Sequence, residues 1–247
     1  MSTPDVTVVV TAHNESAVCG PTMRSAEAAI AAARDAGLSV EPIIALDAAT
    51  ESTRRYFTQS VFDSWQRREF DVRDLGRVRN AVLPETSGRH VAFLDADDLF
   101  SENWLTRGVG MLDAAAGRGE QVIAHPEVNI IFDATTTVLV NLDQDSPLFS
   151  PQYLYLRNPY DALCLAPREA YEEIPYRPND LADGLAFEDW TFALETMERG
   201  WVHRIVPDTI IFKRRRDESL VTASTGRRAI VRALPGTAID RIRGLSG

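Results

Sequence analysis

Apolar residues follow two alternating patterns through the first 116 residues of the chain. Runs of strand type, in which nearly every position is apolar or β-branched, lie at residues 6–12, 40–46 and 90–94, with a weaker one at 69–72. Apolar residues recur at helical spacing between and after these runs, at residues 23–33, 75–83 and 104–116. A strand without polar alternation is covered on both faces, as in a parallel sheet. The pattern therefore predicts an α/β fold whose right-handed crossovers build a mostly parallel central sheet flanked by helices.

The second half of the chain has a less regular pattern. Strand-like runs lie at residues 122–141, with a bend near Thr136, and as a last pair at 202–206 and 209–212. An apolar stripe predicts a helix from about Glu188 to Gly200. The residues between, 143–160, are rich in Pro, Asp, Asn and Tyr, and we interpret them as an active-site loop. No composition shift marks a boundary, so we expect a single domain.

The composition is that of a folded protein with a sizeable core. The chain has 247 residues, of which 45% are hydrophobic and 25% are charged. No apolar stretch approaches the roughly 18 residues of a membrane-spanning helix, and the first residues lack the basic and apolar regions of a secretory signal. We therefore expect no transmembrane segment and a cytoplasmic location, either free or peripheral at the inner membrane surface. Abundant Ala and Arg suggest a bacterial source.

Charge is unevenly distributed. The net charge is -10, yet residues 213–247 hold nine basic and three acidic side chains, so the remaining residues carry about −16. An acidic body does not suit nucleic acid, whose binding depends on neutralising phosphates. We expect residues 226–247 to form a basic tail that is exposed to solvent, or that contacts nucleotide phosphates or an anionic membrane surface.

Scarce residue types exclude several classes of protein. Cys19 and Cys164 are the only cysteines, which excludes a CxxC zinc site and a disulfide framework and leaves both as small buried hydrophobes. Lys213 is the only lysine, so a Walker-type phosphate loop is excluded. No GxSxG sequence is present, which argues against a hydrolase nucleophile elbow. His125 and His203, each beside a predicted strand, are more often packed side chains than metal ligands.

Polar side chains follow three of the predicted parallel strands. His13 to Glu15 follow the first strand, Asp47 follows the second, and Asp95 to Asp98 follow the run at 90–94. The carboxyl ends of parallel strands lie along one edge, where doubly wound folds bind ligands. Residues far apart in the sequence should therefore meet in one cleft.

Asp95 and Asp97 form the most distinctive pattern. In an extended segment, positions i and i+2 face the same way, so the two carboxylates predict a hard-oxygen site for Mn²⁺ or Mg²⁺. Such ions are usually completed by substrate phosphates and water. The alternative is an ordinary acidic turn in which Asp98 or Ser101 caps the next helix.

Two further clusters carry candidate chemistry. Glu188-Asp189-Trp190 opens the late helix, either as acids that complement the helix dipole or as a carboxylate that serves as general base. Arg77 and Arg79 diverge by roughly 200° around a helix, so only one of them should face a ligand, the other pairing with a surface carboxylate. A third cluster, which could close over phosphates, is Arg214, Arg215 and Arg216, followed by Ser219.

Together these segments resemble the family 2 glycosyltransferases of GT-A fold. The similar segments occur in the family's order and span nearly the whole chain: VVVTAHNE (8–15), IALD (44–47), GRVRN (76–80), FLDADD (93–98), REAYEEI (168–174), EDW (188–190) and FKRRRDES (212–219). The resemblance implies an enzyme that transfers a sugar, with inversion, from a nucleotide-diphosphate donor to an acceptor hydroxyl. It also implies a nucleotide-sugar-binding half at about 1–100 and an acceptor half at about 101–225.

The resemblance implies roles for individual residues on the donor side. Ala12, Glu15 and Asp47 would line the base and ribose pocket, with Asp47 facing the base. Asp95 would lie near the ribose, and Asp97 would bind the divalent cation, Mn²⁺ or Mg²⁺, that bridges the two phosphates. That cation would act as a Lewis acid on the leaving group.

On the acceptor side, the resemblance implies that Asp189 is the catalytic base and that Glu188 and Trp190 shape the pocket. On the donor side, Arg77 or Arg79 would approach the nucleotide's base or its diphosphate. Many family members carry a histidine before the C-terminal serine, where this chain has Arg216. Either the cation is then held more loosely, or arginine charge takes over part of its role.

The resemblance favours a UDP-sugar as donor and a glycan, a lipid-linked molecule or a small molecule as acceptor; it does not indicate an oligomeric state. A GT-A-like module that binds a nucleotide-sugar or glycan without turnover is the main alternative. A haloacid-dehalogenase-type phosphatase would also use an Asp-x-Asp such as Asp95 and Asp97, but on its first strand and with a later lysine. A nucleotidyltransferase should have a Gly-rich loop after the first strand, which HNESAVCG is not.

Overall fold

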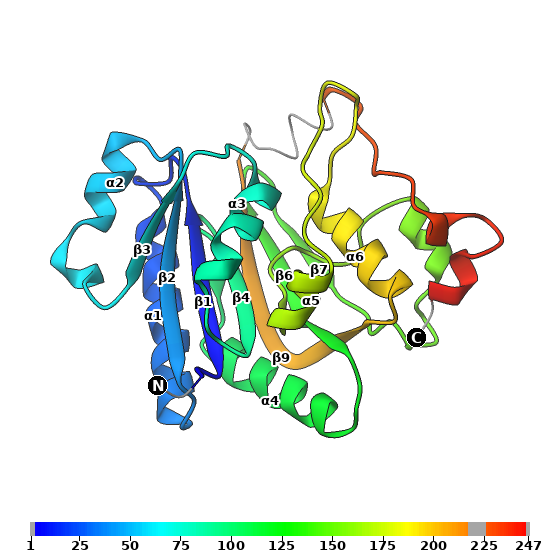
Figure 1. Ribbon diagram of the computed structural model, residues 1–247, viewed down its shortest axis with the longest axis horizontal. Coiled ribbons are helices and arrows are strands. Elements are labelled where there is room, and N and C mark those ends of the chain that lie inside the picture. The colour runs from blue at the N-terminus through cyan, green and yellow to red at the C-terminus, as the bar shows by residue number, and fades with distance from the viewer. Residues whose placement is uncertain (1–2, 217–225, 246–247) are drawn as a thin grey trace.

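A computed structural model describes residues 3–216 and 226–245 and has a nine-stranded mixed sheet with helices on both faces (Figure 1). The first half contains, in chain order, β1 (Val6–Ala12), α1 (Cys19–Asp35), β2 (Val40–Asp47), α2 (Glu51–Phe57), β3 (Gln66–Phe70), α3 (Leu75–Val82), β4 (His90–Asp95), β5 (Leu99–Phe100) and α4 (Trp104–Gly117). The second half contains β6 (Val122–Asp133), β7 (Thr137–Val140), β8 (Leu165–Pro167), α5 (Arg168–Glu173), α6 (Glu188–Glu198) and β9 (Val202–Arg215).

The predicted parallel sheet is confirmed for the first four strands. They lie in the order β3-β2-β1-β4, and each neighbouring pair is parallel. Both faces of β1 are buried, as its run of apolar and β-branched residues predicted. The carboxyl ends of β1, β2 and β4 therefore share one edge, the upper one in Figure 1. The third strand lies at Gln66–Phe70, a few residues before its predicted position.

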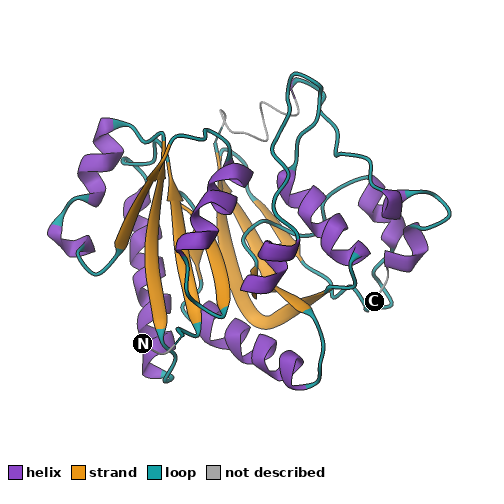
Figure 2. Cartoon of the chain, viewed as in Figure 1, coloured by secondary structure: helices purple, strands orange, loops and turns teal. Residues whose placement is uncertain are grey.

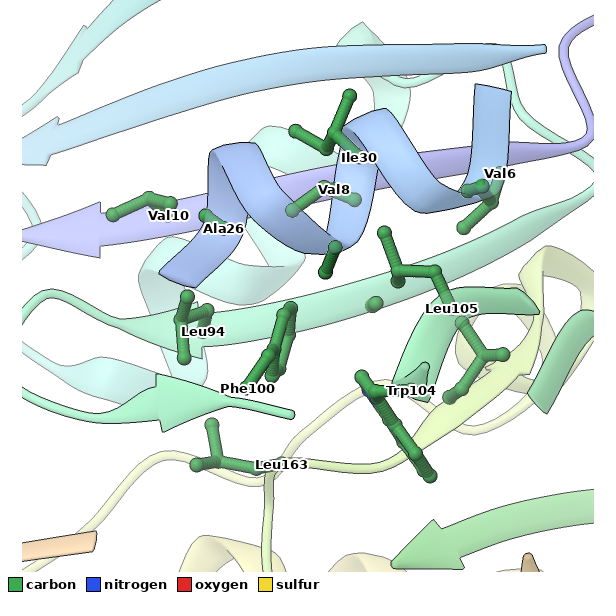
Figure 3. Packing of buried hydrophobic residues seen from close by; sticks show 14 of the residues in the cluster. Val6, Val8, Val10, Ala26, Ile30, Leu94, Phe100, Trp104, Leu105 and Leu163 are labelled. Atoms are coloured by element: carbon green, nitrogen blue, oxygen red, sulfur yellow. The ribbon is translucent and has the colours of Figure 1, made fainter. Parts of the chain in front are cut away.

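Alternate residues of β1 enter two separate hydrophobic clusters. Val6, Val8 and Val10 pack under α1 and α4, against residues such as Ile30 and Trp104 (Figure 3). Val9 faces the opposite side, where α3 and α5 cover the sheet. Burial of apolar surface stabilises a protein by roughly 25 cal/mol per Å², so these two clusters are the main stabilisation of the sheet whose strand ends form the site.

The second half adds strands of mixed direction to the sheet. β8 is antiparallel to β4 and β6, whereas β9 runs parallel to β6 and antiparallel to β5. The strand-like runs at residues 122–141 form two strands, β6 and β7, which pair as an antiparallel hairpin. The predicted last pair of strands is wrong, because residues 202–215 form one long strand. Asp208, with a φ of 57°, interrupts its pattern without ending it, beside a register shift in β6.

The C-terminal segment folds back onto the protein. Beyond β6 and β9, α6 and several short turns form a lobe of helices and loops (Figure 2), and residues 226–245 pack against it. Ile242 and Leu245 are buried, Gln144 Nε2 donates to the Leu245 carbonyl at 2.7 Å, and Tyr155 Oη donates to the Thr237 carbonyl at 2.7 Å. Two apolar side chains thus anchor a segment whose other residues are mostly exposed or half-buried. Within residues 3–216 and 226–245, no helix is both long enough and apolar enough to cross a membrane.

Candidate active site

The acidic turn after β4 lies at the shared carboxyl edge of the parallel strands. Asp95 ends β4 beside Thr11 of β1, whose hydroxyl donates to Asp95 Oδ1 at 3.0 Å. The same oxygen accepts from Arg79 Nη2 at 2.9 Å. Burial alone would raise the pKa of Asp95, but the charges of Arg79 and Lys213 outweigh it and hold the pKa below its usual value. Asp95 is therefore ionised at neutral pH and anchored from two elements.

Asp97 lies next to Glu15, which follows β1. Arg216 Nη2 lies 2.9 Å from Asp97 Oδ2 and 3.4 Å from Glu15 Oε1, so one guanidinium bridges both carboxylates. The other oxygen of Glu15 accepts from the backbone N–H groups of His13 at 2.6 Å and Asn14 at 2.7 Å. The predicted convergence of the ends of β1 and β4 is thus confirmed, with an arginine between them.

Asp98 is buried beneath the same turn and contacts β9. Its Oδ1 accepts from the backbone N–H of Arg214 at 2.7 Å, and Lys213 Nζ lies 3.5 Å from its Oδ2. The alternative in which Asp98 or Ser101 caps α4 is wrong: the residue before that helix is Asn103, which makes no capping bond. Asp98 instead joins the turn to the last strand of the sheet.

Arg79 is a completely buried arginine at the centre of the site. Besides Asp95, its guanidinium pairs with Glu188 Oε1 at 3.4 Å and lies over the rings of Phe93 and Tyr176. A buried guanidinium needs such partners, because transfer of a charge out of water is costly. Arg79 therefore ties α3 to the ends of β4 and α6. The prediction that Arg79 forms an ion pair with a carboxylate on the protein surface is therefore wrong, because Arg79 is buried inside the protein.

Asp47 connects the end of β2 to the loop after β3. Its Oδ1 accepts from the backbone N–H groups of Val72 at 2.8 Å and Arg73 at 3.1 Å, and His13 Nδ1 lies 2.8 Å from its backbone carbonyl oxygen. Both Asp47 and Ala12, the last residue of β1, are buried at the same edge. The residues predicted to line a base pocket therefore lie together beside the acidic turn, whereas Arg77 lies on the exposed face of α3.

The start of α6 presents Glu188, Asp189 and Trp190. Phe187, just before the helix, has a φ of 69° and a ψ of 64°, a left-handed conformation that costs a residue with a side chain roughly 1–3 kcal/mol. Glu188 Oε2 accepts from Asn179 Nδ2 at 3.1 Å, and Trp190 Nε1 donates to the Leu154 carbonyl at 3.1 Å. These bonds fix the first turn of the helix and so the position of Asp189.

Asp189 is set apart electrostatically from the other carboxylates of the site. Burial, the charge of Glu188 and the charge of Asp161 raise its pKa to about 7, against the opposing effects of Lys213 and the Trp190 N–H. A carboxylate with a pKa near neutrality suits proton transfer at neutral pH. Asp189 can thus exchange a proton near neutral pH.

Residues 7–122 match the family model described as Glycosyl transferase family 2. This part of the chain belongs to that family. Among solved structures, residues 1–349 of S. aureus TarS, in complex with UDP-GlcNAc, superpose with a TM-score of 0.62 at 14% identity, covering 87% of this chain and 60% of that one. The mannosyltransferase PcManGT from Pyrobaculum calidifontis, in complex with GDP-Man and Mn²⁺, superposes with a TM-score of 0.57 at 17% identity, covering 86% and 57%. A search of curated proteins found no significant match.

The likenesses establish the fold as that of GT-A glycosyltransferases, as the sequence predicted. This chain spans about 60% of the length of the TarS chain, so part of that protein has no counterpart here. The family match covers the chain up to Val122, including the acidic turn after β4. It does not reach α6 and Asp189.

Two residues that the sequence analysis passed over join the halves of the site. Lys213 Nζ lies 2.8 Å from Asp161 Oδ1 and also neighbours Asp98. Burial alone would lower the pKa of Lys213, but Asp161, Asp98 and Asp95 together raise it above its ordinary value. The sequence did contain a signal for Lys213, because it is the only lysine of the chain and lies within a run of arginines. Nothing local marked Asp161, which lies in an irregular segment.

His125 of β6 and His203 of β9 form a buried stack of two rings. His125 Nε2 lies 2.8 Å from His203 Nδ1, and His203 Nε2 lies 2.9 Å from the Thr196 hydroxyl oxygen. Both rings stack on Tyr160. They are packed side chains, which was the favoured interpretation.

The divalent cation that the Asp-x-Asp pattern predicts does not fit the side chains as they are arranged. An ion on Asp97 would have to share that carboxylate with the Arg216 guanidinium, whose Nη2 lies 2.9 Å from Asp97 Oδ2. Asp95 Oδ1 is engaged by Thr11 and Arg79, and Asp97 Oδ2 by Arg216. Ser219, the last member of the predicted phosphate-facing cluster, lies outside the described residues.

Proposed function

We propose that this protein is an inverting glycosyltransferase that moves a sugar from a nucleotide-diphosphate donor to an acceptor hydroxyl. One observation supports the proposal above all. The acidic turn after β4, which lies within the family match, belongs to the same site as Asp189, a carboxylate whose pKa is raised to about 7. Arg79 links the two directly, since it pairs with Asp95 on one side and with Glu188, the neighbour of Asp189, on the other.

The donor would lie along the carboxyl edge of β1, β2 and β4. In this proposal Ala12, Glu15 and Asp47 line the base and ribose pocket, and Asp95 lies near the ribose. The backbone bonds to Glu15 and Asp47 hold the loops after β1 and β3 in place for that purpose. UDP-GlcNAc and GDP-Man in the neighbouring structures support a nucleotide-sugar donor. We favour a UDP-sugar.

Transfer requires one bond of the anomeric carbon to break, a new one to form, and one proton to move. The bond from that carbon to the β-phosphate oxygen breaks, and its electron pair leaves with the nucleoside diphosphate. The acceptor oxygen bonds to the opposite face of the carbon, which inverts its configuration. Asp189 takes the acceptor's proton, because a hydroxyl is a poor nucleophile until a positioned base removes its proton. Glu188 and Trp190 hold that base in position through their bonds to Arg79, Asn179 and Leu154.

The acceptor would approach the start of α6 from the lobe of helices and loops, and we propose a glycan, a lipid-linked molecule or a small molecule. The phosphatase alternative finds no support, because the acidic turn follows the fourth strand in sequence and not the first. A module that binds without turnover predicts tight donor binding with no product, which the following experiment distinguishes.

The proposal predicts slow release of nucleoside diphosphate when the protein is incubated with its donor. UDP-, GDP- and TDP-sugars would be assayed separately, each with Mn²⁺, with Mg²⁺ and with EDTA, and donor binding would be measured by calorimetry. We expect one class of donor to be hydrolysed slowly and UDP-sugars to bind. Binding without release, even in the presence of candidate acceptors, would favour the non-catalytic module. If no donor bound at all, the proposed function would be wrong.

The pH dependence of turnover should report the ionisation of Asp189. The base acts only when deprotonated, so kcat/KM should rise with pH through about 7 and fall by about tenfold per unit below it. Asp161→Asn removes a negative neighbour and should move the midpoint to lower pH. The carboxylate of Asp189 also interacts electrostatically with four other residues, Glu188, Lys213, Arg79 and Tyr176. All four are the same in wild type and in Asp161→Asn. A profile that is flat from pH 5.5 to about 8.5 would contradict this role.

A further inference from the structure

The sheet delivers Arg216 to the acidic turn. β9 pairs with β6 up to Arg215, which lies opposite Asp133, and Ala134 N–H donates to the Arg215 carbonyl at 2.9 Å. One residue earlier in β9, the Arg214 N–H bonds the buried carboxylate of Asp98. The backbone that leads into Arg216 is therefore held on both sides by hydrogen bonds, so its place beside the turn follows from the sheet.

The Arg216 guanidinium stands where the Asp-x-Asp pattern predicts a cation. Its Nη2 is 2.9 Å from Asp97 Oδ2 and 3.4 Å from Glu15 Oε1. The Asp97 side chain is 12% exposed and that of Arg216 is 41% exposed, so the carboxylate is covered while the guanidinium still reaches solvent. A guanidinium has five N–H donors in a planar fork that suits bidentate contacts to phosphate, and both of these contacts use one nitrogen.

A divalent ion at this turn would compete with that arrangement. Mg²⁺ and Mn²⁺ bind through one or two carboxylates together with substrate phosphates. Here Asp95 is held by Arg79, and Asp97 by Arg216. An ion on Asp97 would have to displace the guanidinium or lie beside a like charge.

We propose that Arg216 takes the place of the divalent cation at Asp97 and binds the donor diphosphate directly through its remaining N–H donors. This inference rests on the proposed function and specifies how its leaving group is stabilised. When the bond between the anomeric carbon and the phosphate oxygen breaks, the electron pair goes to the nucleoside diphosphate, and the fixed charge of Arg216 meets the new negative charge. Asp97 and Glu15 hold the guanidinium in place, so it need not be reoriented during the reaction.

The test is binding of UDP and of GDP by calorimetry, in Mn²⁺ and in EDTA, to the full chain. Wild type should bind one of these nucleotides with the same affinity in both conditions. Arg216→Gln should weaken that binding by about tenfold or more, in Mn²⁺ and EDTA alike. Arg216→His supplies an imidazole ligand and should make nucleotide binding Mn²⁺-dependent. Arg118→Gln, on an exposed arginine at the end of α4, is the charge-matched control and should not change binding.

Electron paramagnetic resonance of Mn²⁺ gives a second readout that needs no variant. Wild type mixed with whichever of UDP and GDP it binds should hold Mn²⁺ no more tightly than that nucleotide alone does. Loss of nucleotide binding in EDTA, or a protein-dependent gain in Mn²⁺ affinity, would overturn the inference and leave the proposed transferase intact. Absence of UDP and GDP binding in every condition would overturn both.

Discussion

Replacing Asp189 with asparagine should lower the rate of sugar transfer by about 10²- to 10⁴-fold, the usual contribution of a positioned general base. Asparagine keeps the size of the side chain and its acceptor oxygen for the Trp190 N–H, but it cannot take a proton. The loss should therefore appear in kcat, with donor affinity unchanged, because Asp189 lies on the acceptor side in our proposal. Single-turnover transfer and donor calorimetry on the same variant measure the two quantities.

Asp183→Asn is the matched control for this prediction. Asp183 is an exposed carboxylate in the loop before α6, and the same substitution there should leave transfer unchanged. The pH dependence expected for wild type should also disappear in the Asp189 variant. If Asp189→Asn kept most of the wild-type rate, another group would have to be the base.

Replacing Arg79 with leucine should destabilise the protein by about 3–5 kcal/mol, the range measured when one partner of a buried ion pair is removed. Asp95 and Glu188, whose side chains are 19% and 7% exposed, would each lose a cationic partner. The rings of Phe93 and Tyr176 would lose their cation contact as well. Urea-induced unfolding at pH 7 measures the change.

Arg77→Leu, two residues away on the exposed face of α3, is the control and should change the free energy of unfolding by less than about 0.5 kcal/mol. The cost at Arg79 should also depend on pH. Arg79 helps to hold the pKa of Asp95 below its usual value, so this stabilisation is present above the usual carboxyl range and is lost as pH falls through the native pKa. The difference between wild type and variant should therefore shrink in acid. Equal stability of the two proteins at pH 7 would contradict the structural role of Arg79.

The local pattern of the chain predicted the first half well. The run Val6–Ala12 is apolar at nearly every position, and a strand of that kind is stable only when both faces are covered. From that follows the parallel sheet, and from the sheet the common edge of Glu15, Asp47 and Asp97. The regular alternation made these distant residues predictable neighbours. The second half has no such alternation, and there the long β9 and the packed C-terminal segment were missed.

The sequence by itself determined the fold class, the acidic turn on a buried strand and the place of Glu188-Asp189-Trp190 at the start of a helix, because each depends on short-range periodicity. Only the tertiary structure decided which charges pair. Arg79 and Arg77 differ by two positions, yet one is fully buried between two carboxylates and the other is exposed. Arg216 reaches Asp97 across more than a hundred residues, through the register of β9 on β6. Electrostatic partners depend on distance in space and on burial, and a linear pattern contains neither.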